Sequence, residues 1–321
     1  MTNSYLHDSA EAIAVAYLGP AGSFTGQAAL RFFGPQAKLV SVPAHDIARQ
    51  VRRGVERGGA KFGMIPVANI KHGYIENTFS SLYDTAGVQV IGEVLLPVEF
   101  HLLGNSPMEQ IHTVTSHEAG LSQCRAGLDR LDAELGRAIK RVPATSTSAG
   151  VQMAAQTPGV VALGSMEAAR QSAVEVLRTG MQDHPENVTH FWALGLGQPV
   201  RRGTRNKTLF LVELEPGTSN MLRLLQLFAE HDVTVKMFKE HTIASKSRAG
   251  VWSRAYFVEC EGHISDEGLN AVYRALRRAE WEVLRGRRGR LLGSYPAFAA
   301  EQLRFMPRQK GALCNELLAC A

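Results

Sequence analysis

The chain has 321 residues, of which 45% are hydrophobic and 20% charged, a composition typical of a globular protein with a sizeable core and not of a disordered chain. The net charge of +5 and the short arginine runs at residues 201–205 and 285–290 indicate solvated linkers and loops or a mild attraction for an anionic substrate, and no nucleic-acid partner. No apolar run approaches the length of a membrane span, and the polar first residues lack a secretory-signal pattern, so we expect a cytoplasmic protein with no membrane partner.

The spacing of the four cysteines predicts neither disulfides nor a metal centre. Cys124, Cys260, Cys314 and Cys320 form no CxxC pair and no short cluster with histidine. In a reducing compartment, isolated cysteines of this kind are free thiols. We therefore expect no metal and no redox cofactor.

The first third of the chain alternates between strand-like and helix-like segments. An apolar strand at residues 13–18 precedes the glycine-rich turn 19–25 and a helix at 27–33. Further strands are expected at 40–42, 62–67, 88–96 and 99–103, further helices at 46–56 and from 78 to 83, and a polar loop at 68–73. This alternation predicts an α/β lobe with mainly parallel strands and ligand sites at their carboxyl ends.

A second α/β lobe, at about residues 107–184, follows the first. Its expected strands lie at 113–116, 139–142 and 160–164, and its expected helices at 119–131, 146–156 and 166–175. A strand at 190–194 would then return to the first lobe. Two lobes joined by crossing segments predict a cleft, which is a common place for a small-molecule site.

The last third of the chain has a different order of elements. Residues 197–206 have the composition of a linker. Beyond them we expect strand 207–213, helix 219–230, strands 233–241 and 254–261, helix 265–279 and strand 281–286, which is the βαββαβ order of a ferredoxin-like module. The expected organisation is a tail at 1–12, the two-lobed domain at 13–196, the linker, a module at 207–296, and a tail at 297–321.

Seven short motifs stand in a definite order between residues 14 and 296. They are YLGPAGSFT at 17–25, GEVLLPV at 92–98, Ser116-His117 with Gln123-Cys124, STSA at 146–149, NVTHF at 187–191, FVECEGH at 257–263 and LGSYP at 292–296. Each motif is short, but in this order and spacing they resemble the motifs of the prephenate dehydratase family.

The resemblance implies a fold, an assembly and a reaction. The fold is a two-lobed periplasmic-binding-protein-like catalytic domain with a C-terminal ACT domain, assembled as a homodimer or homotetramer. The reaction belongs to phenylalanine biosynthesis: a lyase binds prephenate, a small dianion, and removes carbon dioxide and the ring hydroxyl to give phenylpyruvate. Such chemistry needs groups that hold anions and an acid that assists the departing hydroxide, and no cofactor.

The resemblance also assigns site residues. In the turn, Gly22, Ser23 and Phe24 are placed so that main-chain N–H groups and the following helix start attract a carboxylate. Thr189 stands at the position of the family's catalytic threonine, whose hydroxyl passes a proton to the leaving group. The other expected substrate contacts are Asn69, Thr78, Ser116, His117, Ser146, Thr147 and Phe191.

Most of these residues also have a structural interpretation, which the sequence leaves open. The glycine-rich turn is an ordinary strand-to-helix connection, and Thr189 a plain strand threonine. Ser116 and Ser146 are natural helix caps, and His117 is a structural histidine bonded to the backbone.

Two stretches depart from the family pattern near the expected site. His190 replaces an arginine; histidine cannot form the permanently charged bidentate fork, but it acts as an acid or base near neutral pH. We therefore count His190 with Thr189 as a catalytic candidate and expect both side chains to lie beside the substrate ring. In PVANIKHG at 66–73, Ala68 replaces an acid and Ile70 a serine, so a polar wall becomes partly apolar. Lys71 and His72 add positive charge there, at the site or simply facing solvent.

The effector motifs of the last module depart as well. They read GTSN at 217–220 and KEHT at 239–242. By position the effector contacts would be Gly217, Ser219, Asn220, Glu240 and His241, with Ser219 as a helix cap. The replaced segment predicts little response to phenylalanine and leaves open another amino-acid effector or a structural, dimer-forming module.

Three functions remain open at this point. The first is a prephenate dehydratase, and the second a lyase that decarboxylates prephenate or a related substrate without expelling the ring hydroxyl. The third is a non-catalytic binding protein that regulates through a small molecule. The altered lining favours the second and third hypotheses, while Thr189 favours the first.

Overall fold

The computed structural model describes residues 13–57, 59–197, 202–244, 252–278 and 289–298. The chain divides into two compact units. The first unit comprises Met1–Ile47, Met64–Ile75 and Val94–Phe191, and the second comprises Ala48–Gly63, Glu76–Glu93 and Trp192–Ala321. Among the described residues, no helix combines the length and hydrophobicity that crossing a membrane requires.

A six-stranded sheet has the order β2-β1-β3-β11-β5, with β4 paired to β3. Its strands are β1 (Ala14–Leu18), β2 (Lys38–Val42), β3 (Phe62–Asn69), β4 (Gly73–Tyr74), β5 (Val88–Pro97) and β11 (Val188–Leu196). Its helices are α1 (Phe24–Phe33), α2 (Ile47–Arg57) and α3 (Glu76–Asp84), with a short 3-10 turn at Ala44–Asp46. β1 and β2 are parallel, as predicted.

The expected loop at residues 68–73 is a hairpin instead. β3 continues to Asn69 and then pairs antiparallel with β4. Gly73 closes the turn with a φ of 73°, which a residue without a side chain adopts readily. Polar composition alone did not reveal the hairpin, because the short β4 strand is exposed.

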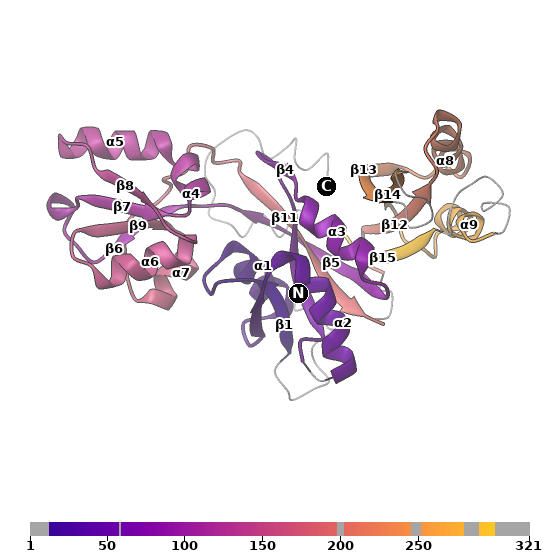
Figure 1. Ribbon diagram of the computed structural model, residues 1–321, viewed down its shortest axis with the longest axis horizontal. Coiled ribbons are helices and arrows are strands. Elements are labelled where there is room, and N and C mark those ends of the chain that lie inside the picture. Colours follow the sequence, from indigo (N-terminus) through magenta and orange to yellow (C-terminus); the bar gives the residue numbers. More distant parts are fainter. Residues whose placement is uncertain (1–12, 58, 198–201, 245–251, 279–288, 299–321) are drawn as a thin grey trace. The chain divides into compact units, whose positions relative to one another are not determined.

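The second lobe, which lies within the first unit, is built on a five-stranded sheet with the order β10-β6-β9-β7-β8 (Figure 1). Its strands are β6 (His101–Gly104), β7 (Thr113–Ser116), β8 (Lys140–Pro143), β9 (Val160–Gly164) and β10 (Glu175–Arg178). Its helices are α4 (Glu118–Gln123), α5 (Arg125–Leu135), α6 (Thr147–Gln156) and α7 (Met166–Ser172), with a 3-10 turn at Met108–Gln110. β7 is parallel to β8 and β9, but β6 runs antiparallel to β9 and β10.

Two predicted helices of this lobe were wrong in extent. The segment 119–131 is two helices, α4 and α5, separated at Cys124, whose φ of −119° and ψ of 21° are not helical. The segment 166–175 ends at Ser172 because Ala173 adopts a left-handed conformation with a φ of 50°. The chain then enters β10, an edge strand that the sequence did not reveal.

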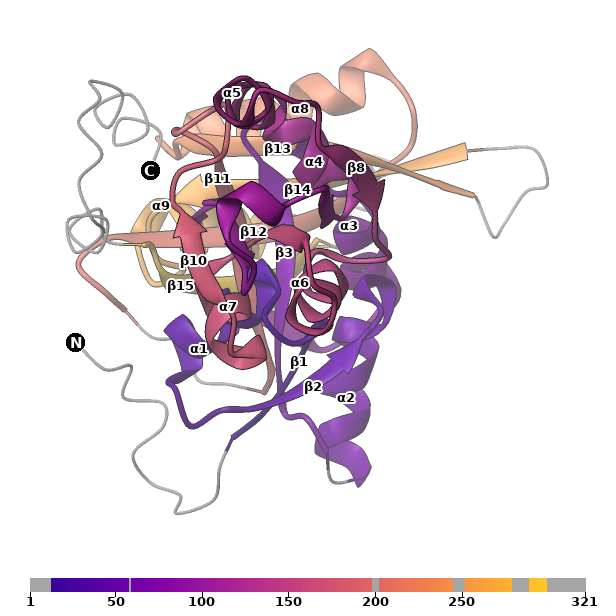
Figure 2. The same cartoon turned by 90° about the vertical axis from the view of Figure 1, so that its left-hand side faces the viewer.

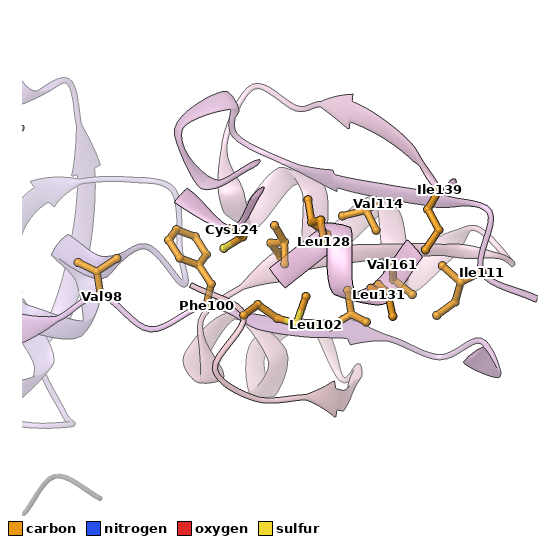
Figure 3. Packing of buried hydrophobic residues seen from close by; sticks show 12 residues of the cluster. Val98, Phe100, Leu102, Ile111, Val114, Cys124, Leu128, Leu131, Ile139 and Val161 are labelled. Atoms are coloured by element: carbon orange, nitrogen blue, oxygen red, sulfur yellow. The ribbon is translucent and has the colours of Figure 1, made fainter. Parts of the chain in front are cut away.

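The central strand β9 explains why helices cover both faces of this sheet. All five of its residues are buried. Val161 (Figure 3) and Leu163 pack into a core on the side of α5. Val160 and Ala162 pack into a core on the side of α6 and α7. Successive strand residues point to opposite faces, so a continuous apolar strand needs cover on each side. Each fully buried Val or Leu contributes about 1.5–3 kcal/mol.

The last part of the second unit has the predicted βαββαβ order (Figures 1 and 2). Its elements are β12 (Asn206–Leu214), α8 (Thr218–Glu230), β13 (Val235–Ala244), β14 (Trp252–Glu261), α9 (Glu267–Leu276) and β15 (Arg290–Pro296). The four strands form one sheet with the order β13-β14-β12-β15. The predicted strand at 281–286 lies outside the described residues, and the strand that closes the described sheet is β15.

The two faces of this ferredoxin-like sheet are chemically different. Phe210 and Val258 belong to the apolar core that α8 and α9 cover. On the opposite face lies a buried charged group, which we call the Lys207 cluster. It comprises Lys207, Glu93 of β5, Glu259 and Tyr295. Lys207 Nζ lies 3.0 Å from Glu93 and 3.5 Å from Glu259, and Tyr295 donates its hydroxyl hydrogen to Glu259.

Candidate active site

Thr189 is held by a buried amide. Asn69, at the end of β3, donates from its Nδ2 to Thr189 Oγ1 at 2.9 Å and to Asn187 Oδ1 at 2.8 Å. Asn69 Oδ1 in turn accepts the backbone N–H of Lys71 at 2.9 Å. Both the oxygen and the nitrogen of the Asn69 amide are therefore hydrogen-bonded, and the NH₂ group points at the threonine. The structure thus brings together two of the predicted site residues, Asn69 and Thr189.

The same network continues through three side chains that the sequence did not single out. Asn187 Nδ2 donates to Gln123 Oε1 at 2.9 Å. Gln123 Nε2 lies 2.9 Å from His72 Nε2. Asn187 is 2% exposed and Thr189 9% exposed, whereas His72 is on the surface. We call this chain of side chains the Asn69 network; it joins the start of β11 to α4 and the β3–β4 turn.

The β3–β4 turn contacts the segment at residues 186–188 and helix α4 with three consecutive residues. The N–H of Ile70 donates to the carbonyl of Val188 at 3.0 Å. Lys71 Nζ pairs with Glu186 at 2.5 Å, and His72 reaches Gln123. Lys71 and His72, which the sequence left as added positive charge, are thus engaged with partners around the Asn69 network.

The glycine-rich turn before α1 is a capped helix start. Ser23 Oγ accepts the N–H of Gly26 at 3.2 Å and donates to the carbonyl of Leu18 at 2.9 Å. The Gly22 carbonyl accepts from Ser165 Oγ at 3.0 Å. A Cβ on Gly22 would lie 3.0 Å from Ala168 Cα, and its φ is 79°. Gly22 is therefore required by close packing of the turn against the start of α7.

Phe24 packs into the α5-side core. Its ring lies 5.4 Å from the ring of Phe100 in an edge-to-face arrangement, and it borders the core that Figure 3 displays. The first-turn amides of α1 that carry no intrahelical acceptor belong to this same segment. The turn therefore presents backbone donors while its aromatic ring anchors it.

Helix starts gather at one edge of the second-lobe sheet. β7, β8 and β9 are mutually parallel and lead into α4, α6 and α7 respectively. Parallel strands end at the same edge, and each helix start carries a partial positive charge. Ser146, as predicted, caps α6 by accepting the N–H of Ala149 at 3.0 Å, and Thr147 is the first residue of α6. This edge is suited to holding an anion.

The predicted cap Ser116 is wrong, because its neighbour takes that place. His117 is the N-cap of α4, and its Nδ1 accepts the N–H of Ala119 at 3.2 Å. Ser116 is fully buried and donates its hydroxyl hydrogen to the carbonyl of Leu163 at 2.9 Å. A Cβ on Gly150 of α6 would lie 3.2 Å from Ser116 Cα. Ser116 thus joins β7 to β9 beneath the start of α6.

β11 separates the two catalytic candidates. Thr189 and His190 are consecutive residues of this strand, and successive strand side chains point to opposite faces. Thr189 and Phe191 are buried, with Phe191 at 1% exposure, while His190 is half-buried. The expectation that both side chains lie beside one substrate ring does not fit a regular strand, and Thr189 is the member that the Asn69 network holds.

Thr78 and the expected effector residues belong to the second unit. Thr78 is fully buried in α3. Glu240 pairs with Arg254 at 3.1 Å, and the His241 ring lies 5.6 Å from that of Tyr83. Burial lowers the pKa of His241 and so favours its neutral form. The segment that was expected to contact an effector is thus packed against neighbouring side chains.

The predicted cap of α8 was wrong. The N-cap is Gly217, and Ser219 lies exposed in the first turn. Asn220 donates from Nδ2 to the carbonyl of Glu215 at 3.1 Å. The loop before α8 is therefore closed by Asn220 rather than by a serine cap.

Two of the four cysteines lie within the described residues. Cys124 and Cys260 are free thiols, as expected, and both are buried. Burial, reinforced by Asp183 beside Cys124 and Glu259 beside Cys260, raises the pKa of both thiols. They are therefore unreactive core residues at neutral pH. Cys314 and Cys320 lie outside the described residues.

Comparisons with known proteins agree with this architecture. The family model for prephenate dehydratase matches residues 15–199. The bifunctional chorismate mutase/prephenate dehydratase of Aquifex aeolicus is 30% identical over 88% of this chain and 74% of that protein. The prephenate dehydratase of Mycolicibacterium vanbaalenii is 26% identical over 88% of this chain and 90% of that protein.

Solved structures share the fold. The prephenate dehydratase of Arthrobacter aurescens in complex with L-Phe superimposes with a TM-score of 0.74 at 22% identity, over 96% of each chain. The quorum-quenching acylase GqqA gives a TM-score of 0.74 at 20% identity, over 90% of this chain and 99% of that one. Together with the family model, which spans more than half of the sequence, these findings establish that the chain belongs to the prephenate dehydratase family of enzymes.

Proposed function

We propose that this enzyme converts prephenate to phenylpyruvate in phenylalanine biosynthesis. The bond between the ring and its carboxylate breaks, carbon dioxide leaves, and the electron pair enters the ring. The bond to the ring hydroxyl then breaks, or breaks in concert, and one proton converts the departing hydroxide to water. The product ring is aromatic, so the protein has only to hold the dianion and deliver that proton.

The observation that carries this proposal is the direction of the hydrogen bond at Thr189. Asn69 donates to Thr189 Oγ1, so the threonine hydroxyl is an acceptor there and its own hydrogen is directed elsewhere. A hydroxyl has one hydrogen to donate. We assign that hydrogen to the ring hydroxyl of the substrate, where it assists the departure of hydroxide.

The charges of the substrate match the main-chain donors that the first unit offers. The turn at residues 19–25 and the helix start capped by Ser146 offer main-chain N–H groups to the two carboxylates. Gly22, Ser23, Phe24 and Thr147 are the residues we assign to this task. His117, exposed at the start of α4, is a further candidate. We assign Ser116 and Phe191 to support of the site, because both are buried.

We further propose the finer organisation that the family resemblance implies. The two lobes have the periplasmic-binding-protein-like arrangement, and the ferredoxin-like module is an ACT domain. We also propose a cytoplasmic homodimer or homotetramer. The Arthrobacter aurescens relative is described as a complex with L-Phe, which supports an amino-acid effector for this fold. In this chain the segment that contains Lys239 and His241 departs from the effector motif of the family, so we expect its effector to differ from phenylalanine.

The test is to incubate the purified enzyme with prephenate and identify the products. We expect phenylpyruvate, carbon dioxide and water as products. Phenylpyruvate is detected by its absorbance and identified by mass spectrometry. Heat-treated enzyme is the control for the spontaneous, acid-catalysed loss of the same groups.

Two other products would contradict the proposal in different ways. A non-aromatic dihydro-hydroxyphenylpyruvate would identify a decarboxylase that keeps the ring hydroxyl. Binding of prephenate without turnover, measured by calorimetry, would identify a non-catalytic binding protein.

A further inference from the structure

The Asn69 network has a definite hydrogen-bond direction. Asn69 donates to Asn187 Oδ1, so the other end of the Asn187 amide, Nδ2, donates to Gln123 Oε1. The Gln123 amide is thereby oriented with its Nε2 facing His72 Nε2. An amide NH₂ group only donates. His72 Nε2 must therefore be the acceptor, and the imidazole carries its hydrogen on Nδ1.

His72 is the outermost acceptor of this chain of donors. If His72 is replaced by a residue without an acceptor, the orientation of the Gln123 amide with Oε1 toward Asn187 loses a stabilising hydrogen bond. If that amide reversed, two NH₂ groups would face one another, and Asn187 would lose the partner that fixes its own direction. The backbone N–H of Lys71 keeps the Asn69 amide in its present direction, so a reversed Asn187 amide would turn its NH₂ group against that of Asn69. This repulsion would displace the NH₂ group that orients Thr189.

We propose that His72 is a positioning residue for the reaction, acting through Gln123, Asn187 and Asn69 on the hydroxyl of Thr189. It does not touch the substrate in this assignment. The inference rests on the proposed function, because it requires Thr189 to donate a proton. The family resemblance assigns no role to this position.

The experiment compares variants of the intact enzyme with prephenate as substrate. Because His72 is exposed, His72→Ala is expected to fold, which thermal unfolding checks. We expect it to lower kcat about threefold to tenfold, the size of one lost orienting hydrogen bond, with KM little changed. His72→Gln offers an amide oxygen as acceptor and is expected to restore kcat to within about twofold of the wild-type value.

Two controls separate positioning from a general effect on the turn. Lys71→Ala removes the neighbouring ion pair with Glu186 but leaves the Gln123 contact, and it is expected to retain the wild-type kcat. In a Gln123→Ala background, His72→Ala is expected to have no further effect, because the two residues act in series.

Four results would overturn the inference. They are a His72→Ala enzyme with unchanged kcat, a His72→Gln enzyme no better than His72→Ala, a Lys71→Ala enzyme impaired as much as His72→Ala, and independent, multiplying effects of His72→Ala and Gln123→Ala. If the wild-type enzyme does not convert prephenate at all, the proposed function fails and this inference fails with it; the wild-type measurement therefore distinguishes the two failures.

Discussion

The molecule contains two buried polar networks of opposite character. In the Asn69 network the members are neutral amides, a hydroxyl and an imidazole, joined end to end and reaching the surface at His72. In the Lys207 cluster a single ammonium lies between two carboxylates, and all the members are at most 9% exposed. A neutral hydrogen bond contributes about 0.5–1.5 kcal/mol, whereas removing one partner of a buried ion pair costs about 3–5 kcal/mol.

This difference indicates what each network does. The neutral network holds the hydroxyl of Thr189, which we propose as the proton donor, at little electrostatic cost. The charged cluster holds strands together, since Glu93 lies on β5, Lys207 on β12, Glu259 on β14 and Tyr295 on β15. Glu93 also accepts the N–H of Phe298 at 2.8 Å. We therefore expect damage to the first network to appear in catalysis and damage to the second to appear in stability.

The largest expected effect is on catalysis. Thr189→Ala removes the proton donor and should lower kcat by about 10²–10⁴-fold, the usual contribution of a positioned acid. Thr189→Ser keeps the hydroxyl and should retain most of the activity. The measurement is steady-state turnover of prephenate, with thermal unfolding to show that the variant is folded.

His190→Ala is the matched comparison for Thr189→Ala, because the two residues are neighbours on opposite faces of β11. We expect it to have a much smaller effect on kcat. If His190→Ala lowered kcat as much as Thr189→Ala, His190 would have to take part in the catalytic step.

The largest effect on stability is expected in the Lys207 cluster. Lys207→Met leaves two buried carboxylates without their cation and should lower the free energy of unfolding by about 3–5 kcal/mol. Lys236→Met, which removes a more exposed pair with Glu261, should cost at most about 1 kcal/mol. Urea unfolding of each variant measures both values. Similar losses for the two variants would contradict the assignment.

The pH dependence of unfolding sharpens this prediction. Burial lowers the pKa of Lys207, but Glu259 and Glu93 raise it by more, so the net pKa lies above the ordinary value of 10.5. The stabilisation is therefore complete below pH 10.5 and is lost as the pH rises through the pKa of the folded state. Burial also raises the pKa of Tyr295, which adds an alkaline loss of the same sign. Lys207→Met should show a weaker alkaline decline than the wild type.

The smallest expected effect is the response to phenylalanine. In the second unit, Lys239 pairs with Glu76 at 2.7 Å, Glu240 with Arg254, and His241 packs between Tyr83 and Phe257. These side chains already have partners, so millimolar phenylalanine should change kcat or KM by less than about twofold, below the roughly fivefold of ordinary allosteric coupling. Strong inhibition at sub-millimolar phenylalanine would contradict this.

Much of the fold could be predicted from local patterns. The structure confirmed the strands at 113–116 and 160–164 and the βαββαβ order. These could be predicted because apolar runs indicate buried segments and turn residues indicate where those segments end. The break at Cys124 and the edge strand β10 could not be predicted. Cys124 is a buried core residue in an otherwise helical pattern, and β10 is exposed, so neither leaves a periodic signal.

The site was predictable only in part. Asn69 and Thr189 stood out through the family resemblance, but Asn187, Gln123 and His72 did not. Asn187 and Gln123 belong to motifs of the family resemblance, but nothing in the sequence assigned either a role. His72 was interpreted only as added positive charge. Side chains that are 51 to 120 residues apart in the chain meet in this network, and no local pattern encodes such a meeting.

The sequence by itself determined the α/β alternation of the first 196 residues, the βαββαβ order of the last module, the glycine-rich helix start and the presence of a threonine that can carry a proton. These features depend on residue type and on neighbours along the chain. The tertiary structure alone decided which hydrogen bonds Thr189 accepts, which face of β11 His190 occupies, and that Lys207 lies between two carboxylates. The physical reason is that hydrogen-bond direction and charge pairing depend on distances of about 3 Å between atoms, and only the folded chain sets those distances.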